Sequence, residues 1–241
     1  MTPQEKILVV DDEADIREII ALCLKRDGYE IAEAGSAEEA LEVLDPSFSL
    51  ILLDIMMDGM NGYDLATRLR AEGNTIPIIF LTAKTTEGDM LRGFGSGADD
   101  YIKKPFSTKE LSARVKSIIT RSTLPVNTAA EVIQAGPLTI ETKAKTVTVS
   151  GTSLSLTRTE YDILMLLIRH EGHTLTRTDI LSAIWTDDKT VMERTVDVHI
   201  ARLRRKLGDY AHIIANRVGF GYTFRPSGKS PGRKPSHPQV S

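Results

Sequence analysis

Two apolar runs that stop abruptly at carboxylates constrain the fold of this chain most. The run 50–53 (Leu-Ile-Leu-Leu) is followed by Asp54, and the run 7–10 (Ile-Leu-Val-Val) is followed by Asp11 and Asp12. Short continuous apolar runs are typical of parallel strands buried on both faces. Open parallel sheets bind ligands outside the carboxyl ends of their strands, so these acids mark a candidate site.

Strand-like and helix-like segments alternate along the first half of the chain. Strand signals cover residues 7–10, 30–33, 50–53, 76–81 and 99–103, and helical spacing covers 15–26, 37–44, 62–71, 86–94 and 107–121. Five such pairs predict an α/β domain in which helices cover both faces of a five-stranded parallel sheet.

Polar residues at four of the predicted strand ends define a candidate phosphoryl site. They are Asp11 and Asp12, Asp54, Thr82 and Lys104. Taken singly, each is more typical of a turn or a solvated loop. Together, the carboxylates would repel one another without a cation, and their oxygens suit Mg²⁺. We expect Asp54 to attack a phosphoryl donor while Lys104 and the Thr82 hydroxyl bind the phosphoryl oxygens.

Length and charge indicate two domains with different partners. The chain has 241 residues and a formal net charge of −3. Residues 1–121 carry 14 Lys+Arg against 22 Asp+Glu, whereas residues 122–241 carry 16 against 11. We predict domains at 1–121 and 134–226, a flexible linker at 122–133 and a disordered basic tail at 227–241.

The sequence contains no signal for membrane insertion or disulfide bonding. Its apolar runs are far shorter than the ~20 residues that cross a bilayer, and no basic segment leads into an apolar core at the N-terminus. We therefore expect a cytoplasmic protein with no membrane partner. The single cysteine, Cys23, falls on the apolar face of its helix, which favours a packing role.

The second half reads as a small α+β domain with one basic helix. Short strand signals precede a helix at 158–170, which begins with a capping box formed by Thr157 and Glu160, and a glycine-rich hairpin follows at 213–224. In the helix 193–207, the residues of one face are apolar and the opposite face is predicted to be exposed. That opposite face comprises Arg194, Val198, Ala201, Arg202 and Arg205. Arginines bind guanine edges and phosphates, so insertion into a DNA major groove is a fair hypothesis.

Residues 6–121 resemble the receiver domain of two-component response regulators. The resemblance rests on Asp11-Asp12, Asp54, Thr82-Ala83 and the segment 97–106 (Gly-Ala-Asp-Asp-Tyr-Ile-Lys-Lys-Pro-Phe). It implies a flavodoxin-like, doubly wound fold and phosphorylation of Asp54 by a sensor histidine kinase. It also implies that Asp11, Asp12, Asp54 and the Met56 carbonyl hold Mg²⁺, and that Tyr101 moves together with Thr82 as a switch.

Residues 134–226 resemble the winged-helix DNA-binding domain of the OmpR/PhoB class. The matching segments are 157–161, 194–200 and 219–222. The resemblance implies that the helix 193–207 enters the major groove of promoter DNA and that the wing reaches the minor groove. The implied DNA-binding residues are Arg194, Thr195, Val198, Arg202, Arg204, Arg205, Asn216 and Arg217. It also implies that a loop touches RNA polymerase through Thr186, Asp187, Asp188 and Lys189.

The receiver resemblance implies a homodimer that forms on phosphorylation. Its dimer face would use Asp99, Asp100, Glu110, Arg114 and Arg121. Three departures from the family pattern modify these expectations. Asp58 replaces a common proline and adds an acid near the metal, Met90 replaces a basic partner of Glu110, and the order Arg217-Val218-Gly219 changes the wing.

We therefore expect a transcription regulator, not an enzyme, that binds tandem promoter half-sites after phosphorylation. One alternative is a DNA binder whose receiver serves only for dimerisation. The other is a phosphatase with an aspartyl intermediate. Such phosphatases usually carry a second Asp two residues after the nucleophile, where this chain has Met56.

Overall fold

The computed structural model describes residues 4–83, 87–123, 132–185 and 193–226. The chain divides into two compact units, with the boundary after residue 127 and the short segment 155–161 grouped with the first unit. None of the described helices is long and apolar enough to cross a bilayer. The predicted tail at 227–241 and most of the predicted linker lie outside the described residues.

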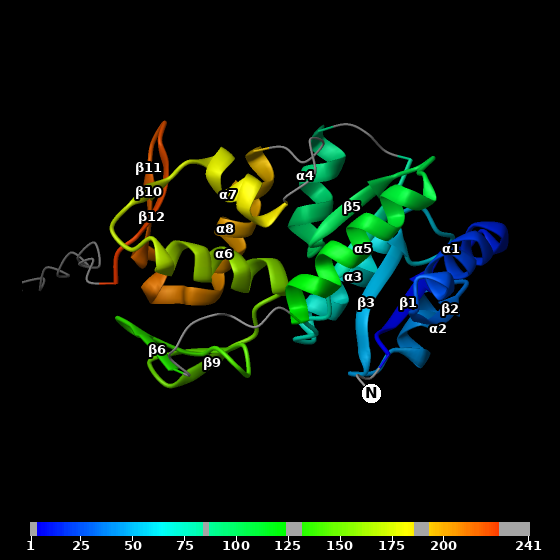
Figure 1. Cartoon of the computed structure of the whole chain (residues 1–241), viewed down its shortest axis with the longest axis horizontal. Helices are drawn as coiled ribbons and strands as arrows, with labels where there is room; N and C mark the ends of the chain where they lie inside the picture. The colour runs from blue at the N-terminus through cyan, green and yellow to red at the C-terminus, as the bar shows by residue number, and fades with distance from the viewer. Residues whose placement is uncertain (1–3, 84–86, 124–131, 186–192, 227–241) are drawn as a thin grey trace, which may run out of the picture. The chain divides into compact units, whose positions relative to one another are not determined.

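The first unit is a five-stranded parallel sheet with helices on both faces (Figure 1). The strands are β1 (Lys6–Val10), β2 (Glu30–Ala34), β3 (Phe48–Asp54), β4 (Ile78–Thr82) and β5 (Asp100–Lys103). The helices are α1 (Ala14–Arg26), α2 (Ala37–Val43), α3 (Gly62–Ala71), α4 (Glu87–Ser96) and α5 (Thr108–Thr123). The spatial order β2-β1-β3-β4-β5 confirms the predicted doubly wound α/β fold.

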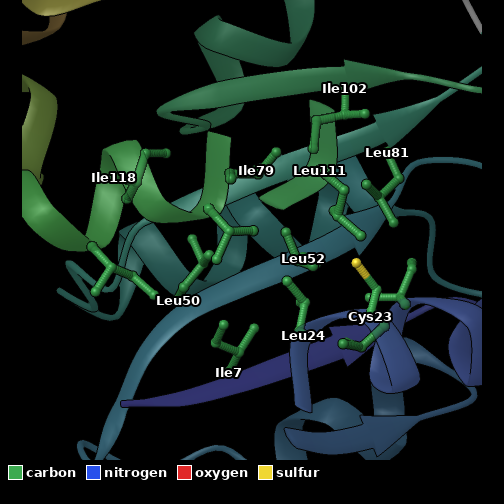
Figure 2. Packing of buried hydrophobic residues seen from close by; sticks show 14 residues of the cluster. Ile7, Cys23, Leu24, Leu50, Leu52, Ile79, Leu81, Ile102, Leu111 and Ile118 are labelled. Atoms are coloured by element: carbon green, nitrogen blue, oxygen red, sulfur yellow. The ribbon is translucent and has the colours of Figure 1, made fainter. Parts of the chain in front are cut away.

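Alternate residues of the central strands point to opposite faces of the sheet, so both faces need an apolar cover. On one face, Ile7, Leu50 and Leu52 pack with residues of α1 and α5 (Figure 2). Cys23 belongs to this buried cluster, as predicted. On the other face, Phe80 meets Tyr63 of α3 edge-on at 5.4 Å.

The second unit contains two small antiparallel sheets and three α-helices. Its four-stranded sheet has the order β6 (Val132–Ala135), β7 (Leu138–Glu141), β8 (Thr146–Val149) and β9 (Thr152–Leu154). The helices are α6 (Arg158–Arg169), α7 (Arg177–Ile184) and α8 (Glu193–Leu207), followed by the 3₁₀ turn η1 (Gly208–Ile213). The second sheet has the order β10 (Thr174–Leu175), β12 (Gly221–Phe224) and β11 (Ile214–Arg217).

Local signals located most of these elements. Both arms of the predicted capping box are present, because Glu160 N donates to Thr157 Oγ1 and Thr157 N donates to Glu160 Oε2. Two boundaries were wrong. β6 begins at Val132, inside the predicted linker, because its strand partner β7 lies further along the chain. Helix α5 runs to Thr123, two residues into the predicted linker.

Candidate functional site

The strand order reverses between β1 and β3, and the candidate site lies at this reversal. Asp11 follows β1, Asp54 ends β3, and these two strands are paired. A crevice forms at such a point because the connections leave the two strands toward opposite faces. Ligand oxygens of Asp11, Asp12 and Asp54 lie within 4.8 Å of one another. Asp11 and Asp54 are buried, whereas Asp12 is exposed.

Lys104 supplies the positive charge in this crevice. Its Nζ lies 2.8 Å from Asp11 Oδ2, 2.9 Å from Asp54 Oδ1 and 3.6 Å from Glu13 Oε1. It directly follows β5, and its backbone N–H donates to the Thr82 carbonyl at 2.7 Å, which places the lysine beside the end of β4. One ammonium group therefore bridges two buried carboxylates from different strands.

The protonation of this cluster follows from burial and charge. Burial raises the pKa of the Asp54 carboxyl, and the hydrogen bond and charge of Lys104 offset this rise only in part. Burial alone would lower the pKa of Lys104, but the hydrogen bonds and charges of Asp11 and Asp54 outweigh it and raise that pKa. The two directions agree with a lysine that stays charged beside an aspartate deprived of water.

A close backbone approach fixes the position of Asp54. Met56 N donates to Asp54 Oδ2 at 2.8 Å, and Gly62 N donates to the Ile55 carbonyl at 3.1 Å. A Cβ at residue 62 would lie 2.2 Å from the Asp54 carbonyl oxygen, so this position requires glycine. No pattern in the sequence predicts a role for Gly62, and only this contact reveals one.

The donor set fits Mg²⁺, which prefers hard oxygen ligands from one or two carboxylates. Asp11, Asp12 and Asp54 would hold the ion, which would neutralise charge on phosphoryl oxygens when bound. Asp58 is exposed and lies outside this group among the residues that the structure describes. Asp58 is therefore not one of the three acids that could hold the ion, and its expected effect as a further acid near the metal stays a prediction. The Met56 carbonyl as a ligand stays a prediction.

Thr82 and Tyr101 line one pocket beside the site. The other lining residues include the aromatic side chains of Tyr63, Phe80 and Phe94. The Tyr101 ring meets Phe94 edge-on at 5.7 Å. The two predicted switch residues therefore line a common pocket, and their joint movement stays a prediction.

In the second unit, α8 exposes fewer basic residues than its sequence pattern predicts. Arg194, Ala201 and Arg205 are exposed, as expected, but Arg202 is only 5% exposed. The predicted exposed face is therefore partly wrong. Thr195, His199 and Arg202 are all buried. Their spacings of four and three residues place them on one side of α8, next to its apolar face.

The wing also differs from expectation. Arg204, predicted to contact DNA, donates from Nε to the Ile214 carbonyl at 3.0 Å and is occupied inside the domain. Asn216 and Arg217 are exposed at the hairpin tip, as expected. The most exposed large apolar side chains there are Val218 (86%) and Phe220 (74%), which the sequence analysis did not select.

Comparisons with known proteins match both halves of the chain. The family described as "Response regulator receiver domain" matches residues 7–116, and "Transcriptional regulatory protein, C terminal" matches residues 151–224. The phosphate regulon transcriptional regulatory protein PhoB of Pseudomonas aeruginosa is 44% identical over 222 residues, which are 90% of this chain and 96% of that protein. The chain is a response regulator of the OmpR/PhoB class.

Other relatives agree with this assignment. ResD of Bacillus subtilis, a transcriptional regulatory protein, is 39% identical and covers 92% of this chain and 97% of its own. A solved structure of a RitR mutant matches with a TM-score of 0.74 and 27% identity, covering 92% of this chain and 99% of that one. This response regulator is thus a DNA-binding transcription regulator and not an enzyme, so the phosphatase alternative is set aside.

The predicted dimer face of the response regulator is rich in internal ion pairs. Arg114 Nη1 lies 3.3 Å from Asp100 Oδ1, and its Nη2 lies 3.3 Å from Glu110 Oε1. Asp99 accepts from Arg70 Nη2 and from Ile78 N, each at 3.1 Å, which ties β5 to α3 and β4. A role of these residues in dimerisation stays a prediction. The side chains of Arg121 and Met90 lie outside the described part, as do Thr186, Asp187, Asp188 and Lys189.

Proposed function

We propose that a sensor histidine kinase phosphorylates this response regulator on Asp54 and thereby controls its binding to promoter DNA. The observation that carries the proposal is the buried Asp54 carboxylate, 2.9 Å from Lys104 Nζ and grouped with two further acids. An Asp54 oxygen forms the new O–P bond as the P–N bond of the donor phosphohistidine breaks, and the imidazole nitrogen keeps the electron pair. Lys104 and the Thr82 hydroxyl then bind phosphoryl oxygens.

Phosphorylation changes the charge balance of the crevice. The phosphoryl group carries roughly −1.5 to −2 charges at pH 7 and replaces the single negative charge of the Asp54 carboxylate. Lys104 is already shared between two acids. We infer that Thr82 and Tyr101 reposition in response, because they line the same pocket. The face that contains Asp100, Glu110 and Arg114 would then favour a homodimer, which binds tandem half-sites.

DNA contact is proposed for Arg194, Val198 and Arg205 of α8 and for Asn216 and Arg217 of the wing. Val198 is half-buried and the other four are exposed. Thr195 and Arg202 could reach DNA only if their side chains became accessible. We also propose contact with RNA polymerase through residues 186–189 and a cytoplasmic location, as the family suggests.

The experiment that tests this function measures binding to a DNA duplex selected from random sequence with the unaltered chain. Binding and oligomeric state are compared with and without acetyl phosphate and Mg²⁺, for the parent and for Asp54→Asn. Stronger binding and dimerisation only in the phosphodonor-treated parent support the proposal. Identical affinity and oligomeric state of the two proteins under phosphodonor would favour the alternative of a phosphorylation-independent DNA binder.

A further inference from the structure

One carboxylate of the recognition helix α8 joins three elements of the DNA-binding domain. Asp197 Oδ1 accepts a hydrogen bond from the Tyr222 hydroxyl at 2.6 Å and another from Arg177 Nε at 2.7 Å. Tyr222 belongs to β12, the central strand of the wing sheet, and Arg177 begins α7. Helix α7, helix α8 and the wing therefore meet at a single oxygen atom.

Two arginines, one from α7 and one from α8, lie over the Tyr222 ring. The guanidinium carbons of Arg177 and Arg204 lie 5.2 Å and 5.5 Å from the ring centroid. Arg204 also donates from both Nε and Nη2 to the carbonyl of Ile214, at the start of β11. The second strand of the wing is thereby tied to α8 as well.

Tyr222 connects these contacts to the exposed tip of the wing. Tyr222 pairs with Leu175 of β10 on one side and with Asn216 of β11 on the other. Asn216 and the following Arg217 are exposed. The contact between Tyr222 and Asp197 therefore joins α8 to the strand that pairs with the exposed end of β11. Burial, together with the hydrogen bond to Asp197, raises the pKa of Tyr222 to about 12, so the phenol remains a hydrogen-bond donor at neutral pH.

We propose that Asp197 is a positioning residue for DNA recognition, which sets the angle between α8 and the β11–β12 wing so that both contact one DNA duplex. A carboxylate on a DNA-binding helix would otherwise be unfavourable, because it repels phosphates. The hydrogen bonds that Arg177 and Tyr222 donate explain why a carboxylate is found at this half-buried position. The inference rests on the DNA-binding function of this domain and concerns the geometry of that binding.

The two roles of this charge predict opposite results for Asp197→Asn. If the charge acted only by repelling phosphates, its removal would strengthen binding to every duplex. If Asp197 positions the wing, binding to the selected duplex should weaken roughly three- to tenfold, while binding to a scrambled duplex of equal length is unchanged or slightly stronger. The ratio of specific to nonspecific affinity therefore separates the two explanations.

Tyr222→Phe tests the same contact without any change of charge. It keeps the aromatic ring beside the two arginines and removes only the hydroxyl donor. We therefore expect a similar decrease in the ratio of specific to nonspecific affinity. Thr178→Val is the matched control, because Thr178 Oγ1 donates to Glu193 Oε1 at 2.7 Å and joins α7 to α8 without touching the wing. It should leave the affinity ratio unchanged.

The measurements use the full-length chain and the duplex selected with it. Binding at two salt concentrations gives the affinity ratio, hydroxyl-radical footprinting reports the wing contact, and circular dichroism confirms folding. Loss of wing protection with retained protection by α8 is the expected result for both Asp197→Asn and Tyr222→Phe. An unchanged affinity ratio and an unchanged footprint in folded Tyr222→Phe would overturn the proposal, as would stronger binding of Asp197→Asn to both duplexes.

Discussion

Lys104 Nζ lies 2.9 Å from Asp54 Oδ1 in a crevice where the aspartate is almost fully buried. The same ammonium group lies 2.8 Å from Asp11 Oδ2. Two carboxylates at the ends of paired strands are thus held together by one ammonium group. This arrangement makes separate predictions for phosphorylation, for stability and for pH dependence.

Asp54→Asn should abolish phosphorylation by acetyl phosphate, because the amide nitrogen and oxygen are far weaker nucleophiles than a carboxylate. Phosphate-affinity electrophoresis of parent and variant after incubation with acetyl phosphate and Mg²⁺ measures the effect. Asp58→Asn is the control, since Asp58 lies outside the metal group, and it should still be phosphorylated. A shifted band that persists in Asp54→Asn would place the phosphoryl group on another residue.

Lys104→Gln should destabilise the receiver and make it depend on a divalent cation. Removal of one partner from a buried ion pair leaves uncompensated charge, so the free energy of unfolding should fall by about 3 kcal/mol in EDTA. Mg²⁺ should recover part of this loss, because binding to the folded state stabilises it. Denaturant unfolding checks both effects. The exposed neighbour Lys103, changed to Gln, should behave like the parent in both buffers.

The raised pKa of Asp54 predicts a dependence of stability on pH. The folded chain favours the protonated carboxyl more than the unfolded chain does, so this group contributes stability at low pH that is lost as the pH rises through the raised pKa. Without metal, Asp54→Asn should therefore melt at a higher temperature than the parent at neutral pH. The difference should vanish well below pH 3.8, the ordinary pKa of the group. A gain that persists in acid would point to packing instead of ionisation.

Gly62→Ala should damage the phosphoryl site through the backbone. The added Cβ would lie 2.2 Å from the Asp54 carbonyl oxygen, so the loop or the strand end must shift, and overpacking of this kind costs about 1–3 kcal/mol. The midpoint temperature of thermal unfolding and the rate of phosphorylation should both decrease. Gly95→Ala in α4 is the control, because no atom lies within 4 Å of its added Cβ. Equal stability of the two variants would show that the approach at residue 62 is not restrictive.

Arg205→Ala should weaken DNA binding by a similar factor for all sequences if Arg205 pairs with phosphate. The slope of log affinity against log salt should then decrease by about 1. Arg194→Ala tests the exposed N-terminal end of α8 in the same way. Lys25→Ala, an exposed change in the receiver, should leave affinity and slope unaltered. Sequence-dependent loss in Arg205→Ala would instead assign that residue to base contacts.

Local patterns in the sequence were sufficient to predict most secondary structure. Helix α8 was predicted with the observed bounds, and so was α3, because apolar spacing and flanking residues act within a few positions. β6 was missed because its four residues become a strand only by pairing with β7. The predicted exposure of Arg202 was also wrong. Periodicity identifies the apolar face of a helix, but it does not determine how much of the helix surface other elements bury.

The sequence by itself determined the class of the chain, and it predicted which residues form the candidate phosphoryl site. The acids, the hydroxyl group and the lysine follow the predicted strands directly. Because the carboxyl ends of parallel strands meet at one edge of the sheet, these residues are expected to lie close together. Only the tertiary structure decided how those groups share charge, that Asp58 faces solvent and that Gly62 must lack a side chain. The hydrogen bonds from Tyr222 and Arg177 to Asp197 are likewise visible only in the tertiary structure. These contacts link segments up to 93 residues apart, and the distance between their atoms depends on packing that no local pattern encodes.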